Sequence, residues 1–578
     1  MFTIKETKSI KFYYSRLYYD FIHGNENLLK YFHFDFHKKD DLFQRADHLS
    51  SGYSGNFRQD VSKLLEDYNR GLGCSPETIK NCIKLRSDNC MVVIGGQQPG
   101  LFTGPVFIIY KIISIIRLSE FLSGLLKTDV VPVFWNASDD SNFSQINSAF
   151  FLDSRLSEVS ISKPGESFKK GYKNIERLDA KKRFSDIVLE RETILSKVGE
   201  LLNTISFTDF TPSVKKLLES CADNTQFKIR SKKQGLLTPS SYFSRLITKM
   251  FSGTGLIIID PNAEGLKNKG LELVKNDIDN FTLISDAVNN RGSALEAEGY
   301  HSQLSLERDT LDFFIVKNGI RQKIRVRQNA GKKSQVFSIM NFSEGKELLT
   351  DRKELESLVS ANPDDLSFNV ILRPLFQDSI LPVVCTVCGP GEAAYFAQTK
   401  DVYEFFNMRQ PVIYPRFSAT IIENKLKKSF SRTGLKYEDL ELDKKEIIER
   451  IAGSGYGEAV KHELYDIESF FKSGLEKIRQ RLADKNPGAL NAIDRTEAAV
   501  SKELRSLSGK ISSEILSKDN IIATDLEKIY SNIFPGGQLQ ERIVNVFNYI
   551  NKYDFIFLKK LNDIIDSREF THKFIEID

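Results

Sequence analysis

Apolar and polar residues follow one another along this chain in blocks whose period changes. A short apolar run at residues 92–94 gives way to four glycines in the ten residues 95–104, and then to a long apolar stretch at 106–126. This order predicts a buried strand, a glycine-rich turn and a long helix. Pro105 suits the first turn of that helix, where the N–H that proline lacks would have no partner.

The glycine-rich turn has two interpretations. Glycines let backbone N–H groups approach a bound group closely, and a helix N-terminus adds positive potential for an anion. The spacing matches neither the Walker A motif nor G-x-G-x-x-G, so the turn carries no general nucleotide signature. A tight strand-to-helix turn without a ligand is the alternative.

A second apolar run, residues 130–135, follows the helix and holds the chain's one tryptophan. Strand, helix and strand in this order predict a right-handed βαβ unit with parallel strands. Parallel sheets bind ligands at the carboxyl ends of their strands. Loop 136–142 should therefore share a crevice with the glycine-rich turn. Its Asp139 and Asp140 could hold a magnesium ion, bind a ribose or accept a substrate amine. An Asp cap of a following turn or helix is the alternative.

Further apolar runs extend the predicted sheet at residues 256–261, 369–374, 381–388 and 412–416. Residues 389–398 repeat the order of glycine turn and helix, with Glu392 in the first turn, where the helix dipole favours a carboxylate. The chain thus predicts an α/β protein with a parallel sheet.

Other patterns interrupt this sheet. Asn318-Gly319 separates two alternating runs, which predicts a hairpin. The expected divisions are N-terminal helices and the first half of the core at 1–149, a mostly helical insertion at 150–240, core continued at 241–290, a small β-rich insertion at 291–368, core completed at 369–418, and a helical domain at 419–578.

Apolar residues at heptad spacing continue through residues 462–516, on either side of a break at Asn486-Pro487-Gly488. Two such helices predict an antiparallel coiled-coil hairpin, and an exposed seam predicts a homodimer. A hairpin that packs only on its own chain is the alternative.

Composition narrows the class of protein. The 578 residues include 81 basic and 77 acidic side chains, a balance that argues against nucleic acid or an anionic membrane as the main partner. The start of the chain lacks an apolar signal segment, so we expect a cytoplasmic protein. Cys385 and Cys388 form a CxxC on a predicted strand, where they point to opposite faces. No zinc-binding spacing of His and Cys occurs, and we predict no protein metal ligands.

At residues 95–105 the sequence Gly-Gly-Gln-Gln-Pro-Gly-Leu-Phe-Thr-Gly-Pro, followed by Tyr110-Lys111, resembles the bacillithiol biosynthesis cysteine-adding enzyme family, BshC. Matching segments continue in the family's order over nearly the whole chain: Val131-Pro132-Val133-Phe134-Trp135, Gly299-Tyr300-His301, Arg373-Pro374-Leu375-Phe376-Gln377, Gly389-Pro390-Gly391-Glu392, Tyr395-Phe396-Ala397-Gln398, Pro415-Arg416, Leu539-Gln540-Glu541-Arg542 and Asn551-Lys552-Tyr553.

The resemblance implies a Rossmann-like core related to class I nucleotidyl-transferases, with connecting-peptide insertions and a dimerising coiled coil. It implies the last step of bacillithiol synthesis, in which cysteine is joined through an amide to glucosaminyl-malate. Because amide formation from a free carboxylate is uphill in water, ATP would activate the carboxylate as an adenylate or acyl phosphate. ATP or ADP is therefore the expected cofactor, and Mg²⁺ could accompany it.

On these grounds we predict that Asp139, Asp140 and Asn147 are catalytic. The predicted substrate- and nucleotide-binding residues are Gly96, Gln97, Gln98, Thr103, Gly104, Arg373, Gln377, Gly389, Gly391, Glu392 and Arg416.

One departure from the family concerns the acidic loop. The family's loop carries two histidines that resemble the HIGH signature of class I synthetases, and Ser141 and Ser148 replace them here. Losing oriented donors at developing charge typically costs about 10²–10³ in rate. Either Lys111, Arg373 or Arg416 substitutes for them, or the chain is a non-catalytic or altered-substrate relative that keeps the fold and binds a nucleotide or metabolite.

Overall fold

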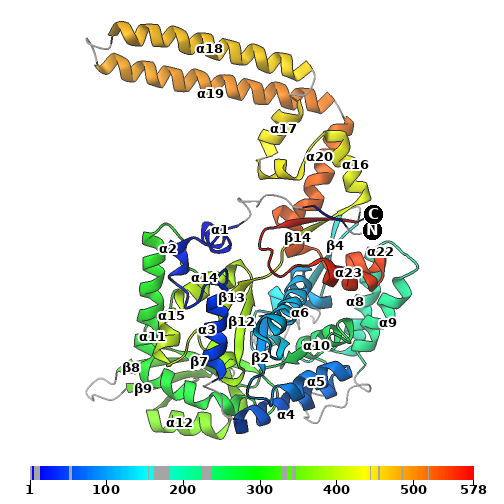
Figure 1. The fold of residues 1–578 in the computed structure, drawn as a ribbon, viewed down its shortest axis with the longest axis vertical. Coiled ribbons are helices and arrows are strands. Elements are labelled where there is room, and N and C mark those ends of the chain that lie inside the picture. Colours follow the sequence, from blue (N-terminus) through cyan, green and yellow to red (C-terminus); the bar gives the residue numbers. More distant parts are fainter. Residues whose placement is uncertain are drawn as a thin grey trace. The chain divides into compact units, whose positions relative to one another are not determined.

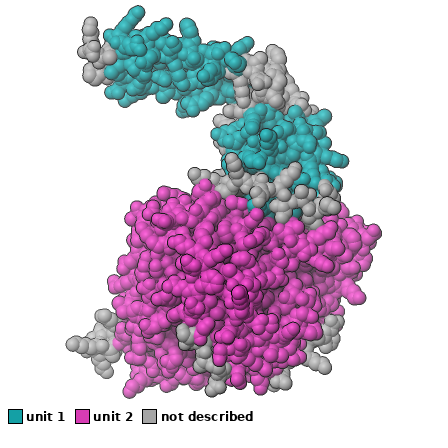
Figure 2. All heavy atoms as spheres, viewed as in Figure 1, with its two compact units in different colours: residues 1–13, 419–540, 572–578 teal, residues 14–418, 541–571 magenta. Residues whose placement is uncertain are grey.

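The computed structural model describes residues 3–5, 14–50, 55–153, 155–161, 182–223, 236–328, 335–341, 346–442, 444–452, 456–482, 487–518 and 520–577. The chain forms two compact units, which Figure 2 shows in two colours. Unit 1 comprises residues 1–13, 419–540 and 572–578, and unit 2 comprises residues 14–418 and 541–571.

A five-stranded parallel sheet forms the centre of unit 2 (Figure 1). Its order is β13-β12-β2-β3-β6, with β2 at Met91–Gln97, β3 at Val130–Asn136, β6 at Ile257–Ile259, β12 at Val383–Cys388 and β13 at Val412–Pro415. The predicted βαβ unit is confirmed, because helix α6 (Phe107–Leu126) joins the parallel strands β2 and β3. Every residue of β3 and β12 is buried, as near-continuous apolar runs require in a sheet covered on both faces.

The strand order changes direction beside β2. From β2 the chain proceeds through β3 to β6 on one side, whereas β12 and β13 lie on the other side. Such a switch point leaves a crevice beyond the carboxyl ends of the two central strands. The crevice therefore lies where β2 and β12 end.

Helices cover the sheet. Helix α6 packs on β2 and β3, α3 packs on β12 and β13, and α4 packs on β6. The N-terminal helices are α1 (Arg16–Ile22), α2 (Glu26–Leu29), α3 (Lys39–Ser50), α4 (Gly55–Gly71) and α5 (Pro76–Lys84). Cys385 and Cys388 are buried free thiols in β12, and burial raises the pKa of both.

The region predicted as a mostly helical insertion begins with a β-hairpin. Strands β4 (Ser148–Leu152) and β5 (Leu156–Ser160) pair antiparallel, and α8 (Arg191–Thr204) and α9 (Thr211–Cys221) follow. Residues 154, 162–181 and 224–235 of this region lie outside the described residues. Helix α10 (Pro239–Met250) then leads into β6.

The β-rich insertion forms a separate antiparallel sheet of order β10-β9-β8-β7-β11. Its strands are β7 (Thr310–Lys317), β8 (Ile320–Gln328), β9 (Gln335–Asn341), β10 (Lys346–Thr350) and β11 (Leu366–Phe368). The predicted hairpin is confirmed: Asn318 and Gly319 both have positive φ, as the turn between β7 and β8 requires. The 3₁₀ turn η5 (Lys267–Gly270), α11 (Leu271–Ala297) and α12 (Arg352–Ala361) border this sheet.

The predicted strand at residues 369–374 is wrong. Helix α13 (Leu372–Ile380) begins there instead, and α14 (Pro390–Gln398) and α15 (Lys400–Phe405) follow β12. The side chain of Asn369 accepts hydrogen bonds from the N–H groups of Ile371 and Leu372, at 2.8 and 3.1 Å, where the helix begins. Pro374 lies in the first turn, where it removes no helical hydrogen bond.

Unit 1 is less uniformly helical than the sequence predicts. Strands β1 (Thr3–Lys5), β15 (Lys573–Ile577) and β14 (Ala419–Glu423) form a three-stranded sheet in that order. Each strand is short, and its partner lies far away in the sequence, so no local pattern could reveal the pairing. The helices are α16 (Asn424–Thr433), α17 (Lys444–Ala452), α18 (Tyr456–Leu482), α19 (Pro487–Lys518) and α20 (Asn520–Ile533).

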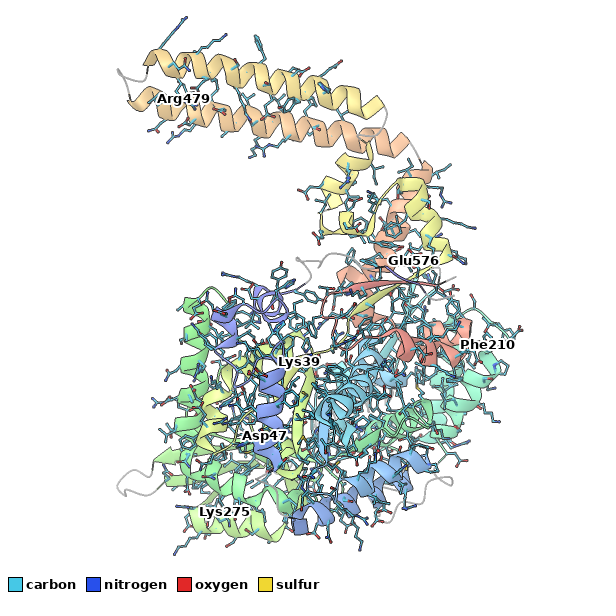
Figure 3. The ribbon with its side chains drawn as sticks, in the orientation of Figure 1. Lys39, Asp47, Phe210, Lys275, Arg479 and Glu576 are labelled. Atoms are coloured by element: carbon cyan, nitrogen blue, oxygen red, sulfur yellow. The ribbon has the colours of Figure 1, made fainter. Side chains whose placement is uncertain are left out.

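Helices α18 and α19 form the predicted antiparallel hairpin. Arg479 of α18 lies 2.5 Å from Asp494 and 3.3 Å from Glu497 of α19, and Figure 3 labels this arginine. Ser501 donates to Glu468 nearer the base of the hairpin at 2.7 Å. Asn486, in the predicted break, lies outside the described residues.

After the hairpin the chain returns to unit 2. Helices α21 (Gln540–Ile543), α22 (Phe547–Tyr553) and α23 (Ile556–Ile564) lie on this returning segment, which belongs to unit 2 from residue 541 to residue 571. No helix in the described part of the chain combines the length and the apolar character that a membrane span requires.

Candidate functional site

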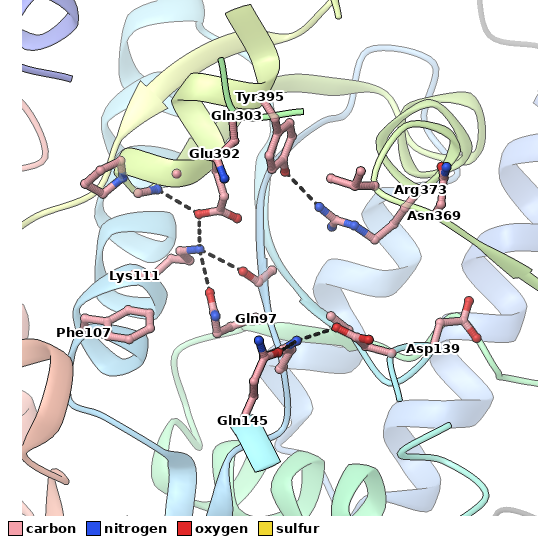
Figure 4. A pocket seen from close by; sticks show the side chains of 18 of the residues that line it. Gln97, Phe107, Lys111, Asp139, Gln145, Gln303, Asn369, Arg373, Glu392 and Tyr395 are labelled. Atoms are coloured by element: carbon pink, nitrogen blue, oxygen red, sulfur yellow. Dashed lines mark hydrogen bonds and ion pairs between the residues drawn. The ribbon is translucent and has the colours of Figure 1, made fainter. Parts of the chain in front are cut away.

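A cavity of about 680 Å³ opens at the carboxyl ends of β2 and β12, where the strand order switches (Figure 4). Its wall comes from several segments of unit 2: the end of β2, the loop after β3, the loop before α13, and the start of α14. The predicted site residues that line it are Gly96, Gln97, Gln98, Asp139, Asp140, Arg373, Gly389, Gly391, Glu392 and Arg416.

Two glycines of β2 allow the backbone to pack closely at this edge. A Cβ on Gly95 would lie 2.8 Å from the carbonyl oxygen of Val387, and a Cβ on Gly96 would lie 3.0 Å from that of Trp135. Gly391 differs, because a Cβ there would meet no atom within 4 Å. Its missing side chain leaves open space at the start of α14, beside the cavity.

Lys111 of α6 lies at the base of the cavity and is 1% exposed. Its Nζ donates to the carbonyl oxygen of Gly96 at 2.8 Å, to Gln97 Oε1 at 3.1 Å and to Glu392 Oε2 at 2.5 Å. Burial lowers the pKa of Lys111, and the carboxylate of Glu392 opposes that shift. The ammonium is thus saturated by protein acceptors and joins β2, α6 and α14.

Arg373 of α13 presents a guanidinium to the cavity. Its Nη2 donates to the hydroxyl of Tyr395 at 2.8 Å, and this is its one side-chain hydrogen bond to a described residue. Burial raises the pKa of Tyr395, so the partner is a neutral phenol. Arg542 also lines the cavity and forms no ion pair with any described residue. Both cations are therefore suited to an anionic ligand.

Arg416 also lines the cavity, but its charge is already matched. Its Nη2 and Nη1 bind the carboxylate of Glu541 at 2.6 and 3.1 Å, with both side chains almost fully buried. Burial disfavours the charged guanidinium, yet Glu541 outweighs this effect and raises the pKa of Arg416. Ser418 donates to the same carboxylate at 2.9 Å. This pair connects the end of β13 to the returning segment.

Asp140 lies in a polar group on the opposite wall. Gln98 Nε2 donates to Asp140 Oδ2 at 2.5 Å and to Gln145 Oε1 at 2.7 Å, and Arg321 Nη1 lies 3.4 Å from Asp140 Oδ1. The Arg321 guanidinium stacks 4.0 Å from the ring centre of Phe314. Burial lowers the pKa of Arg321, while Asp139 and Asp140 oppose that shift.

Asp139 is held by two buried cations. Lys267 Nζ lies 2.9 Å and Arg183 Nη1 3.7 Å from Asp139 Oδ1. Burial lowers the pKa of Lys267 to about 8, although Asp139 opposes the shift. Asp139 therefore fixes the loop after β3 to neighbouring segments, and its carboxylate is less available to a ligand than that of Asp140.

Four predicted site residues do not line the cavity. Asn147 donates to the carbonyl oxygen of Ile161 at 3.0 Å, and Gln377 donates to its neighbour Asp378 at 3.0 Å. Thr103 and Gly104 lie in the glycine-rich turn, where Thr103 is fully buried.

The glycine-rich turn adopts a strained backbone. Phe102 and Thr103, both non-glycine, have φ of 49° and 78°. Asn545 of the returning segment donates to the carbonyl oxygens of Phe102 and Gly104, at 2.6 and 2.8 Å. A side chain more than 400 positions away in the sequence thus fixes this turn.

The structure adds cavity residues that the sequence does not single out. They come from helices, loops and the antiparallel sheet: Phe107, Gln145, Gln303, Arg321, Phe368, Asn369, Tyr395 and Arg542. The resemblance does include Tyr395 and Arg542 in its matching segments, which is the one signal that could have identified them.

The acidic loop offers no preformed metal site. No group of three or more His, Cys, Asp or Glu among the described residues could hold a metal ion. Ser141 donates its backbone N–H to Asp140 at 2.7 Å, and Ser148 begins β4, so neither serine lines the cavity. The position of both serines outside the lining gives no structural support to the alternative of a non-catalytic relative.

The fold and the cavity define a Rossmann-like α/β protein with a polar cavity at the switch point of its sheet and a C-terminal helical hairpin. The family described as “Bacillithiol biosynthesis BshC, N-terminal Rossmann-like domain” matches residues 3–417, and its C-terminal coiled-coil domain matches residues 419–577. The chain belongs to the BshC family.

Three relatives illustrate the similarity, and each is named “Putative cysteine ligase BshC”. The relative from Geobacillus thermodenitrificans is 27% identical over 525 residues, covering 90% of each chain. That from Chlorobaculum tepidum is 27% identical over 569 residues, covering 93% of this chain and 92% of the relative. That from Salinibacter ruber is 28% identical over 528 residues, covering 90% and 89%.

Proposed function

We propose that this chain is an amide-forming ligase of bacillithiol biosynthesis, which joins the carboxylate of cysteine to the amine of glucosaminyl-malate with ATP as the activating substrate. Membership of the BshC family and the names of its relatives support this class of activity. The observation that carries the proposal is the presence of Arg373 and Arg542 on the cavity wall, neither paired with a described carboxylate. All three substrates bring carboxylate or phosphate groups that such cations bind.

ATP would supply the activation of the cysteine carboxylate, as an adenylate or an acyl phosphate. The start of α14 fits a phosphate or carboxylate, because Gly391 leaves open space beside helix N–H groups. Arg373 and Arg542 would offset negative charge as it develops on the reacting groups. Gln98 and Asp140 would orient the polar part of a substrate on the opposite wall.

Magnesium stays a prediction tied to the nucleotide. Asp139 is engaged by Lys267 and Arg183, and Asp140 by Gln98 and Arg321. These two aspartates thus offer no ready set of oxygen ligands, and Mg²⁺ would bind chiefly through the phosphates of ATP.

A homodimer through the coiled coil is also part of the proposal. Large apolar side chains remain exposed on the hairpin, among them Tyr465, Ile467 and Phe470. Covering them in a second copy would bury apolar surface. Light scattering of the full chain should give twice the monomer mass, and charged replacements at Ile467 and Phe470 should give a monomer.

The activity is tested directly by product mass. The purified chain is incubated with cysteine, glucosaminyl-malate and ATP, alongside an active BshC relative and a reaction without ATP. We expect the amide product only when ATP is present, and at least about tenfold less from Arg373→Gln. Glu296→Gln, which replaces an exposed charge of α11 outside the cavity lining, serves as the surface control and should leave the rate unchanged.

A further arm introduces the two histidines that the family resemblance implies. Because neither serine lines the cavity, Ser141→His with Ser148→His should change the rate by less than about threefold. Absence of product from the wild-type chain, while the relative is active, would contradict the proposal. Product from the double-histidine variant alone would instead favour the non-catalytic alternative.

A further inference from the structure

The cavity wall formed by α13 and α14 contains one carboxylate oxygen that can still accept a hydrogen bond. Glu392 Oε2 accepts from Lys111 Nζ at 2.5 Å and from the N–H of Gly389 at 2.8 Å. Glu392 Oε1 has no hydrogen-bond partner among the described residues, and the side chain is 24% exposed to the cavity. The first oxygen fixes the carboxylate in place, so the second is held ready for a ligand donor.

The same wall offers a guanidinium with unused donors. Only Nη2 of Arg373 donates to a described side chain, the hydroxyl of Tyr395. That hydroxyl positions the guanidinium without neutralising its charge. The remaining N–H groups can bind a carboxylate in the two-point manner that arginine favours.

Helix geometry brings these two groups together. Glu392 and Tyr395 are three residues apart on α14 and therefore share one face of the helix. Tyr395 in turn binds Arg373, and Figure 4 shows the three side chains converging on the cavity. Glu392 is also close enough to stabilise the charge of Arg373. A hydrogen-bond acceptor with negative charge and a donor fork with positive charge thus face the same space.

We propose that Glu392 and Arg373 form a subsite for a zwitterionic α-amino acid, with its ammonium on Glu392 Oε1 and its carboxylate on the Arg373 guanidinium. That the amino acid is cysteine rests on the proposed function. Two other charges that line the cavity are less available to a ligand, because Arg416 is neutralised by Glu541 and Asp139 by Lys267.

This orientation has a chemical consequence. Arg373 neutralises the carboxylate that is to be activated, which reduces its repulsion with the phosphates of ATP. Glu392 holds the α-amine as an ammonium, which is not a nucleophile. The bound cysteine would therefore not attack a second activated cysteine, and the amine of the other substrate would be the one that reacts.

The test compares three ligands by isothermal calorimetry on the full chain without ATP. L-Cysteine carries both charged groups, cysteamine lacks the carboxylate, and 3-mercaptopropionate lacks the ammonium. Each missing charge-assisted contact should weaken binding by about tenfold to a hundredfold.

Two variants identify which residue binds the ammonium group and which binds the carboxylate. In Arg373→Gln, cysteine and cysteamine should bind equally, because the residue that distinguishes them is gone. In Glu392→Gln, cysteine and 3-mercaptopropionate should bind equally, while the glutamine keeps the hydrogen bond that caps α14. Glu296→Gln should leave all three affinities unchanged.

The experiment can refute the assignment of the ammonium to Glu392 and of the carboxylate to Arg373. If either variant weakens all three ligands by the same factor, the proposed subsite is wrong, even if the enzyme makes product. If Glu392→Gln does not fold because Lys111 is left without its carboxylate, Glu392→Gln with Lys111→Met removes both charges and permits the same comparison. If the affinities follow the expected pattern but the enzyme makes no product, the amino-acid subsite is retained and the proposed ligase activity is wrong.

Discussion

The contrast between Gly95 and Gly391 yields a sharp prediction. An alanine Cβ at position 95 would lie 2.8 Å from the carbonyl oxygen of Val387 and 3.0 Å from Ile115 Cδ1. The first of these atoms is backbone of the neighbouring strand, so β2 and β12 must move apart. Overpacking of this kind typically costs about 1–3 kcal/mol, and Gly95→Ala should lower the free energy of unfolding by that amount.

Gly391→Ala should behave in the opposite way. The added Cβ meets no atom within 4 Å and lies in the first turn of α14. Since alanine is a better helix former than glycine by up to about 1 kcal/mol, stability should be unchanged or slightly higher. The methyl group would nevertheless occupy the space that we assign to a phosphate or carboxylate, so product formation should fall by at least about tenfold.

The assay measures both quantities on the same samples. Urea unfolding gives the free-energy change, and product mass against time gives kcat and KM for each substrate. Full activity of Gly391→Ala would refute the assignment of a ligand to the start of α14. A stability loss in Gly391→Ala as large as that in Gly95→Ala would refute the geometric reasoning for both positions.

Three further predictions concern buried polar groups. Glu541→Ala leaves Arg416 buried without its partner and should cost about 3–5 kcal/mol in urea unfolding, whereas replacing both by apolar residues should recover most of the loss. Asn545→Ala removes two hydrogen bonds from the strained turn and should speed amide hydrogen exchange at residues 101–104, while a distant strand exchanges as before. Burial and Asp312 raise the pKa of Asp277 well above its usual value, and burial raises that of Asp312 to about 6. Since the folded state binds these protons more tightly, their stabilisation is complete below about pH 4. The contribution of Asp312 is lost as the pH rises through about 6. Asp277→Asn removes one of the two titrating groups and should therefore flatten the dependence of the unfolding free energy on pH above about pH 4. An unchanged profile would contradict the raised pKa of Asp277.

Local periodicity explains which parts of the fold the sequence reveals. The long apolar helix after Pro105 and the strands on either side of it follow from the pattern alone, because burial on both faces leaves few polar positions. The strand predicted at residues 369–374 fails for a specific reason. The Asn369 side chain accepts from the N–H groups of Ile371 and Leu372 just where helix α13 begins, and a short apolar run cannot distinguish that helix from a buried strand.

The sequence predicts those cavity residues that lie in polar loops at the ends of parallel strands. It predicts fewer of the cavity residues that other segments contribute. Gln98, Asp140 and Glu392 follow directly from the topology of a parallel sheet. The sequence could not identify Arg321 in this way, because it is one of several basic residues that alternate with other residues along β8. Only tertiary packing brings it to the cavity. Likewise, no sequence pattern distinguishes Arg416, which has a buried partner, from Arg373, which keeps free donors.

The return of residues 541–571 to unit 2 bears on how the protein is made. During synthesis the ribosome releases the whole parallel sheet before it releases Asn545, and residues 419–540 emerge in between. Until then the strained turn at Phe102 lacks the amide that holds it, and Arg416 lacks Glu541. A nascent chain that ends before residue 541 would thus carry an incomplete cavity wall and an uncompensated internal charge. The chain would therefore become able to bind substrate only late in translation, when the returning segment forms its contacts with residues far away in the sequence.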